Sequence, residues 1–140
     1  IIMKPSNIKL IITIYLTAFI LNAIWELSHY QLYYDLSGIP KYPHLLLATF
    51  TDALIITIIF LIISIKNKNL SWIKKPKITD CVLSVIFSLA IAISIEVRAL
   101  SIGRWAYKEA MPTILGIGLS PLAQLAVTSI ITILILKHQK

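Results

Sequence analysis

The sequence predicts an all-α, polytopic membrane protein built as a bundle of four transmembrane helices. Of its 140 residues, 58% are hydrophobic and only 14% are charged, whereas soluble domains are about half apolar and about a quarter charged. The mean hydropathy is +0.86. Four apolar runs reach the roughly 20 residues that a helix needs to cross a bilayer. This composition excludes a disordered chain, a coiled coil and an ordinary soluble domain.

The four runs occupy most of the chain. They cover about residues 8–27, 45–65, 81–102 and 114–136, so we expect a single membrane domain over residues 1–140. The first run has a basic start at Lys4 and Lys9, as the core of a signal peptide does. The run is longer than the usual 7–15 residues of that core, so we expect a retained helix. Cys81 is the single cysteine, which excludes an internal disulfide.

The basic residues are divided unequally between the two sides of the membrane. With four spans, both termini and the second loop share one side, and that side holds nine of them: Lys4, Lys9, Lys66, Lys68, Lys74, Lys75, Lys77, Lys137 and Lys140. The other side holds four: Lys41, Arg98, Arg104 and Lys108. The positive-inside rule therefore predicts a cell-membrane protein with both termini in the cytoplasm. No nucleic-acid-binding motif accompanies the net charge, so we expect membrane lipids rather than nucleic acid as partners.

The acidic and aromatic residues gather at the opposite, outer side. Five of the six acidic residues map there, namely Glu26, Asp35, Asp52, Glu96 and Glu109, together with His29 and His44. Most of the rings at this side fit an interfacial aromatic belt, which is formed by Trp25, Tyr30, Tyr33, Tyr34, Tyr42, Trp105 and Tyr107.

Each span also carries one face of polar or small residues at a spacing of four. These faces are Ala18, Asn22 and Glu26; His44, Ala48 and Asp52; Ser84, Ser88, Ala92 and Glu96; and Gly116, Ser120, Gln124, Thr128 and Thr132. Lipid cannot satisfy hydrogen-bonding groups, so we expect the four faces to meet inside the bundle. For the serines and threonines we expect a packing role.

Three carboxylates are the candidate catalytic residues. Asp52 lies roughly 10 Å inside its span, where a charge costs at least about 2.5–3.5 kcal/mol and needs a partner. We expect Asp52 to act as a proton donor, because a low dielectric favours its neutral form. Glu96, beside Arg98 or Arg104, is expected to stay ionised, and Glu26 suits either role.

We expect these acids to line a polar pocket that opens to the outer leaflet and takes a small lipid-like or isoprenoid molecule. The expected ligand-binding residues are Asn22, His29, His44, Arg98, Arg104, Trp105, Tyr107 and Gln124. Gly116, Gly118 and Pro121 are expected to loosen the start of the fourth helix, where freed backbone groups can contact a ligand. No particular cofactor is indicated.

Several alternatives remain open. The Glu-x-x-His spacing of Glu26 and His29 occurs in carboxylate-bridged metal bundles, but the second copy that such sites need is absent, so we assign no metal ligands. A single-metal site that adds His44, Asp52 or Glu96, and a haem between His29 and His44, are weaker alternatives. Serine catalysis lacks its Gly-x-Ser-x-Gly elbow. The acids could instead form a structural ion-pair network, or the chain could be a transporter or channel subunit in a homo-oligomer.

The Trp25–Glu26 helix end and the GRWAY, MP and GIGLSPLAQ segments extend over residues 103–124 and the end of the first span. In these segments the chain resembles small four-span prokaryotic membrane proteins, a resemblance that implies no particular activity. In architecture alone, four spans with inward acids are similar to the EXPERA group, which includes sterol isomerases. No residue role is carried over from either group.

Overall fold

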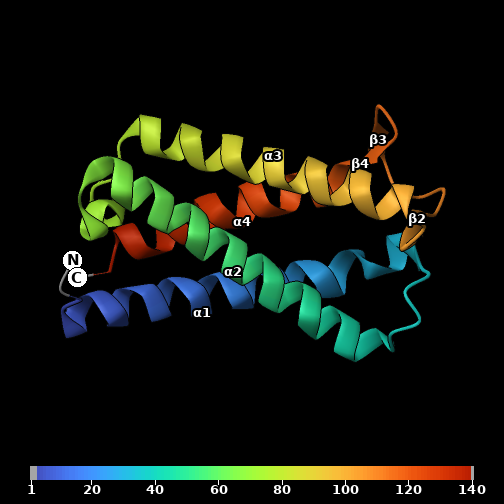
Figure 1. The fold of residues 1–140 in the computed structure, drawn as a ribbon, viewed down its shortest axis with the longest axis horizontal. Helices are drawn as coiled ribbons and strands as arrows, with labels where there is room; N and C mark the ends of the chain where they lie inside the picture. Colours follow the sequence, from blue (N-terminus) through green and yellow to red (C-terminus); the bar gives the residue numbers. More distant parts are fainter. Residues whose placement is uncertain (1–2, 140) are drawn as a thin grey trace.

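Four long helices dominate the computed structural model, which describes residues 3–139 (Figure 1). They are α1 (Pro5–His29), α2 (Lys41–Asn67), α3 (Ile78–Ser101) and α4 (Leu119–Lys137). The short elements between them are η1 (Tyr30–Leu32), β1 (Tyr33–Asp35), η2 (Leu70–Lys74), β2 (Trp105–Tyr107), β3 (Thr113–Ile114) and β4 (Ile117–Gly118). This arrangement confirms the predicted four-helix bundle. Lys140, which was counted among the basic residues above, lies outside the described residues.

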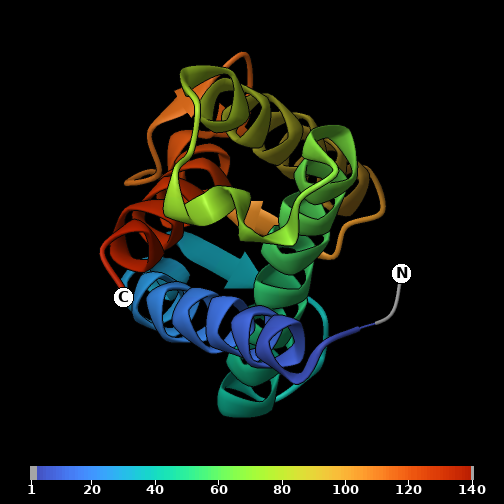
Figure 2. The same ribbon diagram turned by 90° about the vertical axis from the view of Figure 1, so that its left-hand side faces the viewer.

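The helices pack in pairs and the bundle has two distinct ends. α1 packs mainly on α2, α3 packs mainly on α4, and α1 and α4 are also in contact. Both termini and η2 lie at one end, which we call the terminal end (Figures 1 and 2). β1 and β2 pair at the other end, which we call the sheet end. α2 and α3 contact each other less, and they diverge toward the sheet end (Figure 1).

The pattern of burial is that of a protein surrounded by lipid. α1 exposes a row of large apolar side chains spaced four residues apart, at Ile12, Leu16, Ile20 and Ile24. Many buried positions inside the bundle are polar, and among them are Asn22, Ser84, Ser88, Thr128 and Thr132. All four long helices are long and apolar enough to cross a membrane. The chain is therefore a multi-pass membrane protein, because a water-exposed bundle would show the opposite distribution.

The predicted polar faces of α1, α2 and α4 meet inside the bundle, where Gln124 lies within hydrogen-bond distance of Asn22 and Asp52. α3 contacts α4 through Ser84, whose partner Ser129 is outside the predicted row. The hydroxyl groups of Ser84 on α3 and Ser129 on α4 are hydrogen-bonded to each other. The Thr128 and Thr132 hydroxyl groups donate to backbone carbonyls one turn back, each over 2.7 Å. These hydroxyl groups are satisfied within the bundle, as the absence of water in the hydrocarbon core favours, whereas the buried Ser88 hydroxyl has no hydrogen-bond partner among the described residues.

The terminal end of the bundle is closed by apolar packing. Its buried cluster consists of Ile14, Ile59, Phe60, Ile63, Trp72, Ile73, Ile133 and Leu136. The Trp72 indole stacks on Phe60 at 5.4 Å and donates to Ser64 Oγ over 2.9 Å. Next to this cluster, the buried Asp80 carboxylate accepts from Lys66 Nζ over 2.8 Å and from the Lys77 amide over 3.0 Å. These contacts fasten the loop between α2 and α3 to the start of α3.

Strand pairing fastens the sheet end, which the sequence analysis did not predict. β1 and β2 are antiparallel, with Tyr33 opposite Tyr107 and Asp35 opposite Trp105. The pairing extends by one bond beyond the strands, from the Leu36 amide to the Arg104 carbonyl over 3.1 Å. Because β1 follows α1 and β2 follows α3, the two strands connect the ends of helices that are distant in sequence.

The fourth helix begins at Leu119, five residues later than the sequence predicts. Residues 113–118 instead form a hairpin in which β3 pairs with β4. Its two central residues, Leu115 and Gly116, have φ angles of 53° and 80°, as turns with positive φ at both positions require. Ser120 and Pro121 are therefore in the first turn of α4. Proline is tolerated there because the first amides of a helix have no intrahelical acceptor.

The difference between core and lipid-facing positions can be tested on two adjacent residues of α2. Ile59 is 1% exposed and Ile58 is 45% exposed. We expect Ile59→Ala to lower the free energy of unfolding by about 2–5 kcal/mol, because it leaves a cavity. Ile58→Ala should lower it by about 0.5 kcal/mol or less. Equilibrium unfolding in mixed micelles measures both, and equal losses would contradict the packing described here.

Candidate functional site

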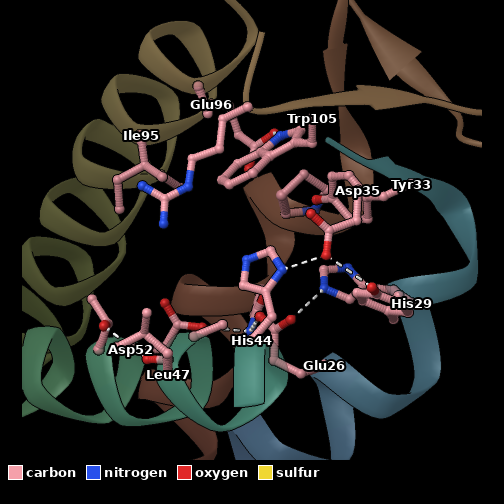
Figure 3. Close-up of a pocket in the computed structure, with 18 of the residues that line it drawn as sticks. Glu26, His29, Tyr33, Asp35, His44, Leu47, Asp52, Ile95, Glu96 and Trp105 are labelled. Atoms are coloured by element: carbon pink, nitrogen blue, oxygen red, sulfur yellow. Dashed lines mark hydrogen bonds and ion pairs between the residues drawn. The ribbon is translucent and has the colours of Figure 1, made fainter. Parts of the chain in front are cut away.

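A cavity of about 370 Å³ lies at the sheet end and receives side chains from all four helices and from β1 and β2 (Figure 3). Its polar lining consists of Glu26, His29, Tyr30, Tyr33, Asp35, His44, Thr51, Asp52, Glu96, Arg98, Arg104, Trp105 and Gln124. Its apolar walls include Leu47 of α2 and Ile102, the residue that follows α3, and these side chains are 48% and 61% exposed. The cavity therefore reaches the lipid-facing surface of the bundle.

Two of the three candidate carboxylates meet at one amide. Gln124 Nε2 on α4 lies 2.8 Å from Glu26 Oε1 and 2.8 Å from Asp52 Oδ2, so these two oxygens lie within twice that distance of each other. The same nitrogen lies 3.1 Å from Asn22 Oδ1. An amide nitrogen carries two hydrogens and here faces three acceptors. Asn22 in turn donates to the Ala18 carbonyl over 2.8 Å, which directs its oxygen toward Gln124.

His29 has a partner at each ring nitrogen. Nδ1 lies 2.8 Å from Ser120 Oγ, and Nε2 lies 3.3 Å from Glu26 Oε2. Trp25 Nε1 also donates to Ser120 Oγ over 3.2 Å. Ser120 does not line the cavity, so its hydroxyl does not face a ligand there. Its contact with Nδ1 holds the buried His29 imidazole in position. The Glu-x-x-His spacing put Glu26 and His29 on one face, but only the structure shows Ser120 beside them, from the first turn of α4.

The third carboxylate, Glu96, is held by the side chains of β2. Glu96 Oε2 accepts from Tyr107 Oη over 2.5 Å and from Trp105 Nε1 over 3.2 Å. Alternate residues of a strand leave from the same face, so Trp105 and Tyr107 both reach this carboxylate. Burial and the Glu96 carboxylate both raise the pKa of the Tyr107 phenol above its ordinary value. Tyr107 therefore stays protonated and remains a donor to Glu96.

The expected pairing of Glu96 with Arg98 or Arg104 was wrong. Among residues 3–139, the ion pairs are Glu26–His29, Asp35–His44 and Lys66–Asp80, and no arginine takes part in them. Two residues along a helix turn the side chain by roughly 200°. Glu96 and Arg98 consequently lie at opposite edges of the α3 face that lines the cavity.

Aromatic rings from β1 and β2 pack over the site. The Tyr33 ring meets His29 edge-on at 5.2 Å and Trp105 edge-on at 5.9 Å, and it lies 5.6 Å from Tyr107. Burial, together with nearby negative groups of which Glu96 is the largest influence, raises the pKa of Tyr33. The rings of Tyr33, Trp105 and Tyr107 pack on the site rather than forming part of an interfacial belt. Tyr34 and Tyr42, in contrast, are exposed.

Asp35 forms a second polar cluster at the rim of the cavity. Its carboxylate accepts from His44 Nδ1 over 2.6 Å, Ser37 Oγ over 2.6 Å and Tyr30 Oη over 2.9 Å. Burial acts to raise the pKa of Asp35, but hydrogen bonds from Ser37, His44 and Tyr30 outweigh it and hold the pKa well below its usual range. The sequence placed Asp35 at this side of the membrane without assigning it to the site.

Most of the predicted site residues lie on the cavity wall, and two lie behind it. Glu26, His29, His44, Asp52, Glu96, Arg98, Arg104, Trp105 and Gln124 line it. Asn22 lies behind Gln124, and Tyr107 lies behind Glu96. Residues that the sequence analysis did not assign to the site are Tyr30, Tyr33, Asp35 and Ser120. They come from the connections and from the first turn of α4, where no helical periodicity marks a face.

The structure offers no arrangement of ligands for the single-metal alternative. In the part of the chain that the structure describes, no group of three or more His, Cys, Asp or Glu side chains is placed to hold a metal ion. His29, one of the two residues considered for a haem, has both ring nitrogens engaged by Ser120 and Glu26.

Comparisons of the chain with known protein families, with curated proteins and with solved structures found no match. The class of protein is established by its four long apolar helices, which make it a four-span integral membrane protein. The resemblance to small prokaryotic four-span proteins stays an expectation.

The Asp35 cluster predicts a stability that depends on acid pH. The pKa of Asp35 is lower in the folded chain than in the unfolded chain, where an Asp pKa is about 3.9. The stabilisation that the Asp35 carboxylate provides is therefore complete above the pKa of the unfolded chain. This stability is lost as the pH falls toward the folded pKa. We expect the unfolding midpoint of the wild type in detergent to fall below about pH 4, and Asp35→Asn to give a lower midpoint at pH 7 and a weaker dependence below pH 4.

The control for this experiment is Glu109→Gln, which changes an exposed carboxylate in the connection between α3 and α4. It should retain the wild-type dependence on pH. An unchanged dependence in Asp35→Asn would contradict the role given to this cluster.

Proposed function

We propose that this membrane protein binds a lipid-like or isoprenoid small molecule in the cavity and transfers protons to or from it. One observation carries the proposal. Glu26 and Asp52 are held by a single Gln124 amide on the wall of a cavity whose apolar rim lies on the lipid-facing surface. Acid groups inside a membrane bundle are costly, and they commonly mark a functional site.

The size and walls of the cavity suit such a ligand. Pockets for small molecules usually measure about 300–1,000 Å³ and are largely apolar with a few polar groups. Here Leu47, Ile95 and Ile102 provide apolar wall. The cavity receives side chains from both α2 and α3, which diverge toward the sheet end (Figure 1). A ligand dissolved in the bilayer could enter from the side without crossing the aqueous phase.

The carboxylates would supply the chemistry. Two carboxyl groups that share one donor in a low dielectric do not both carry a charge readily, so the pair retains a proton that it can transfer. In this scheme Asp52 is the donor, and Glu26 accepts or returns the proton. Glu96, held by Trp105 and Tyr107, stays ionised and stabilises positive charge on the substrate.

The closed terminal end favours this function over a channel within a single chain. The space beside the apolar cluster at the terminal end measures only about 10 Å³. That volume is at the lower limit for a single water molecule. A transport path would therefore need a second copy of the chain, and the proposed binding site does not.

We further propose that the sheet end faces away from the cytoplasm, in the outer half of a cell membrane. Both termini and the lysine-rich η2 connection lie at the terminal end (Figure 1). The excess of basic residues favours the cytoplasm for that end.

Ligand binding is tested by filling the cavity. Ala48 of α2 lines it, whereas Ala90 of α3 is exposed and does not. We expect native mass spectrometry and solvent extraction of the purified wild type to show a co-purified lipid-like molecule. Ala48→Trp should lose this molecule and Ala90→Trp should retain it. Equal retention by both variants would contradict a ligand in the cavity.

Proton transfer is tested with deuterium. The molecule extracted from the wild type is incubated with fresh protein in deuterated buffer, and its mass is followed. We expect the wild type to incorporate deuterium at carbon and Asp52→Asn to lose at least about 10²-fold in rate, the usual contribution of a general acid. Glu109→Gln serves as the control with the wild-type rate. Undiminished exchange in a folded Asp52→Asn protein would remove the proton-donor role.

A further inference from the structure

The carboxylates that line the cavity have hydrogen-bond partners on neighbouring side chains, whereas the arginines that line it have no acidic partner among the described residues. Each lining carboxylate accepts at least one hydrogen bond from a neighbouring side chain. Glu26 and Asp52 accept from Gln124, Glu96 from Tyr107 and Trp105, and Asp35 from His44, Tyr30 and Ser37. No donor in this set is an arginine. Arg98 and Arg104 line the same cavity and form no ion pair among residues 3–139.

The two histidines of the cavity differ in how many of their ring nitrogens have a hydrogen-bond partner. Both ring nitrogens of His29 are engaged by Ser120 and Glu26. His44 uses only Nδ1, which donates to Asp35 over 2.6 Å, and its Nε2 has no hydrogen-bond partner among the described residues. Figure 3 shows the His44 ring between Asp35 and Asp52, with one nitrogen turned toward Asp35. The second nitrogen is therefore available to a ligand.

The backbone holds Arg104 at the sheet end of the cavity. Its amide donates to the Ala99 carbonyl over 2.9 Å, and its carbonyl accepts from the Leu36 amide over 3.1 Å. Arg98 lies in the last turn of α3, at the same end. His44 lies in the first turn of α2, which also begins at the sheet end. Two guanidinium groups that can donate to an anion thus line the sheet end of one cavity, together with a histidine whose second ring nitrogen is an acceptor.

We propose that the ligand is an anionic amphiphile, an inference that rests on the proposed function. Arg98 and Arg104 bind its phosphate or carboxylate head group, because guanidinium groups match the oxygens of such groups with paired donors. His44 Nε2, an acceptor while Nδ1 donates to Asp35, can accept from a hydroxyl group beside it. Its apolar tail runs along Leu47 and Ile95 toward the membrane interior.

This orientation sets where proton transfer occurs. Asp52 lies eight residues beyond His44 on α2, about 12 Å farther along the helix axis. The Glu26–Asp52 pair consequently faces the tail several bonds away from the head group. The substrate class is then an anionic amphiphile with a protonatable carbon in its chain, as in an isoprenoid double bond.

The test compares probes that share a tail or a charge. The full chain in a non-ionic detergent is titrated with dodecyl phosphate, with dodecanol and with inorganic phosphate, and binding is followed by native mass spectrometry and by the fluorescence of Trp105 and the other tryptophans. We expect dodecyl phosphate to bind at least about tenfold more tightly than either other probe, because hydrogen bonds to a charged group contribute this much or more. Equal binding of dodecanol would overturn the anionic head group, and equal binding of inorganic phosphate would overturn the amphiphile.

Variants locate the head group. Arg98→Gln and Arg104→Gln are each expected to weaken dodecyl phosphate binding about tenfold or more. The matched control is Lys108→Gln, which removes a nearby cation that lies over the Tyr34 ring and does not line the cavity. Circular dichroism and unfolding midpoints verify that each variant is folded.

The outcomes separate this inference from the proposed function. If the arginine variants bind dodecyl phosphate like the wild type while Ala48→Trp does not, the cavity binds ligand but the head-group assignment is overturned. If the arginine variants lose binding and Ala48→Trp retains it, the arginines contact surrounding lipid and the cavity assignment is overturned. If the wild type binds no amphiphile and no molecule co-purifies, the proposed function itself is overturned.

Discussion

The Gln124 amide is the interaction on which the arrangement of the bundle depends. No water is available in the hydrocarbon core to satisfy Glu26 and Asp52, so their partners must come from the protein. Gln124 Nε2 lies within hydrogen-bond distance of Glu26 and Asn22 of α1 and of Asp52 of α2, and its two hydrogens are shared among them. A single side chain of α4 thereby holds three helices in one register, and a substitution there would leave Asp52 without a side-chain donor and Glu26 with His29 alone.

α3 contributes no side chain to the hydrogen bonds of the Gln124 amide. The cavity between α2 and α3 is a consequence of this. Glu96 is satisfied by Trp105 and Tyr107 of its own following strand, so it needs no partner on α2. At the terminal end, Lys66 and Asp80 join α2 to α3, and the two helices stay close. At the sheet end, the part of the chain that the structure describes contains no such bond between α2 and α3. The helices diverge there, and the space between them is lined by charged groups.

The helices and their inward faces could be predicted from the sequence because both depend on local spacing. Asn22, Glu26 and Gln124 fall on polar rows that lipid cannot accept. The contacts between distant segments could not be predicted in this way. Nothing in Tyr33 or Trp105 indicates that strands about seventy residues apart will pair. Ser120 appeared only as one member of a polar row, and its contact with His29 depends on the hairpin that delays the start of α4. The expected pairing of Arg98 with Glu96 was wrong because two residues along a helix turn the side chain by roughly 200°.

The two ends of the bundle differ in how their buried and partly buried carboxylates are paired. The terminal end pairs Asp80 with Lys66 and fills its interior with large apolar side chains, as stability alone would favour. At the sheet end, four carboxylates are held by neutral donors and histidines, the exposed Arg98 and Arg104 form no ion pair among the described residues, and a cavity stays open. A void reduces stability in a small bundle. Departures of this kind from consistent packing are expected at functional sites, where the structure is arranged for a ligand that completes it. The large cavity and the buried and partly buried carboxylates Glu26, Asp52 and Glu96 coincide at one end, which is the physical reason for placing the site there.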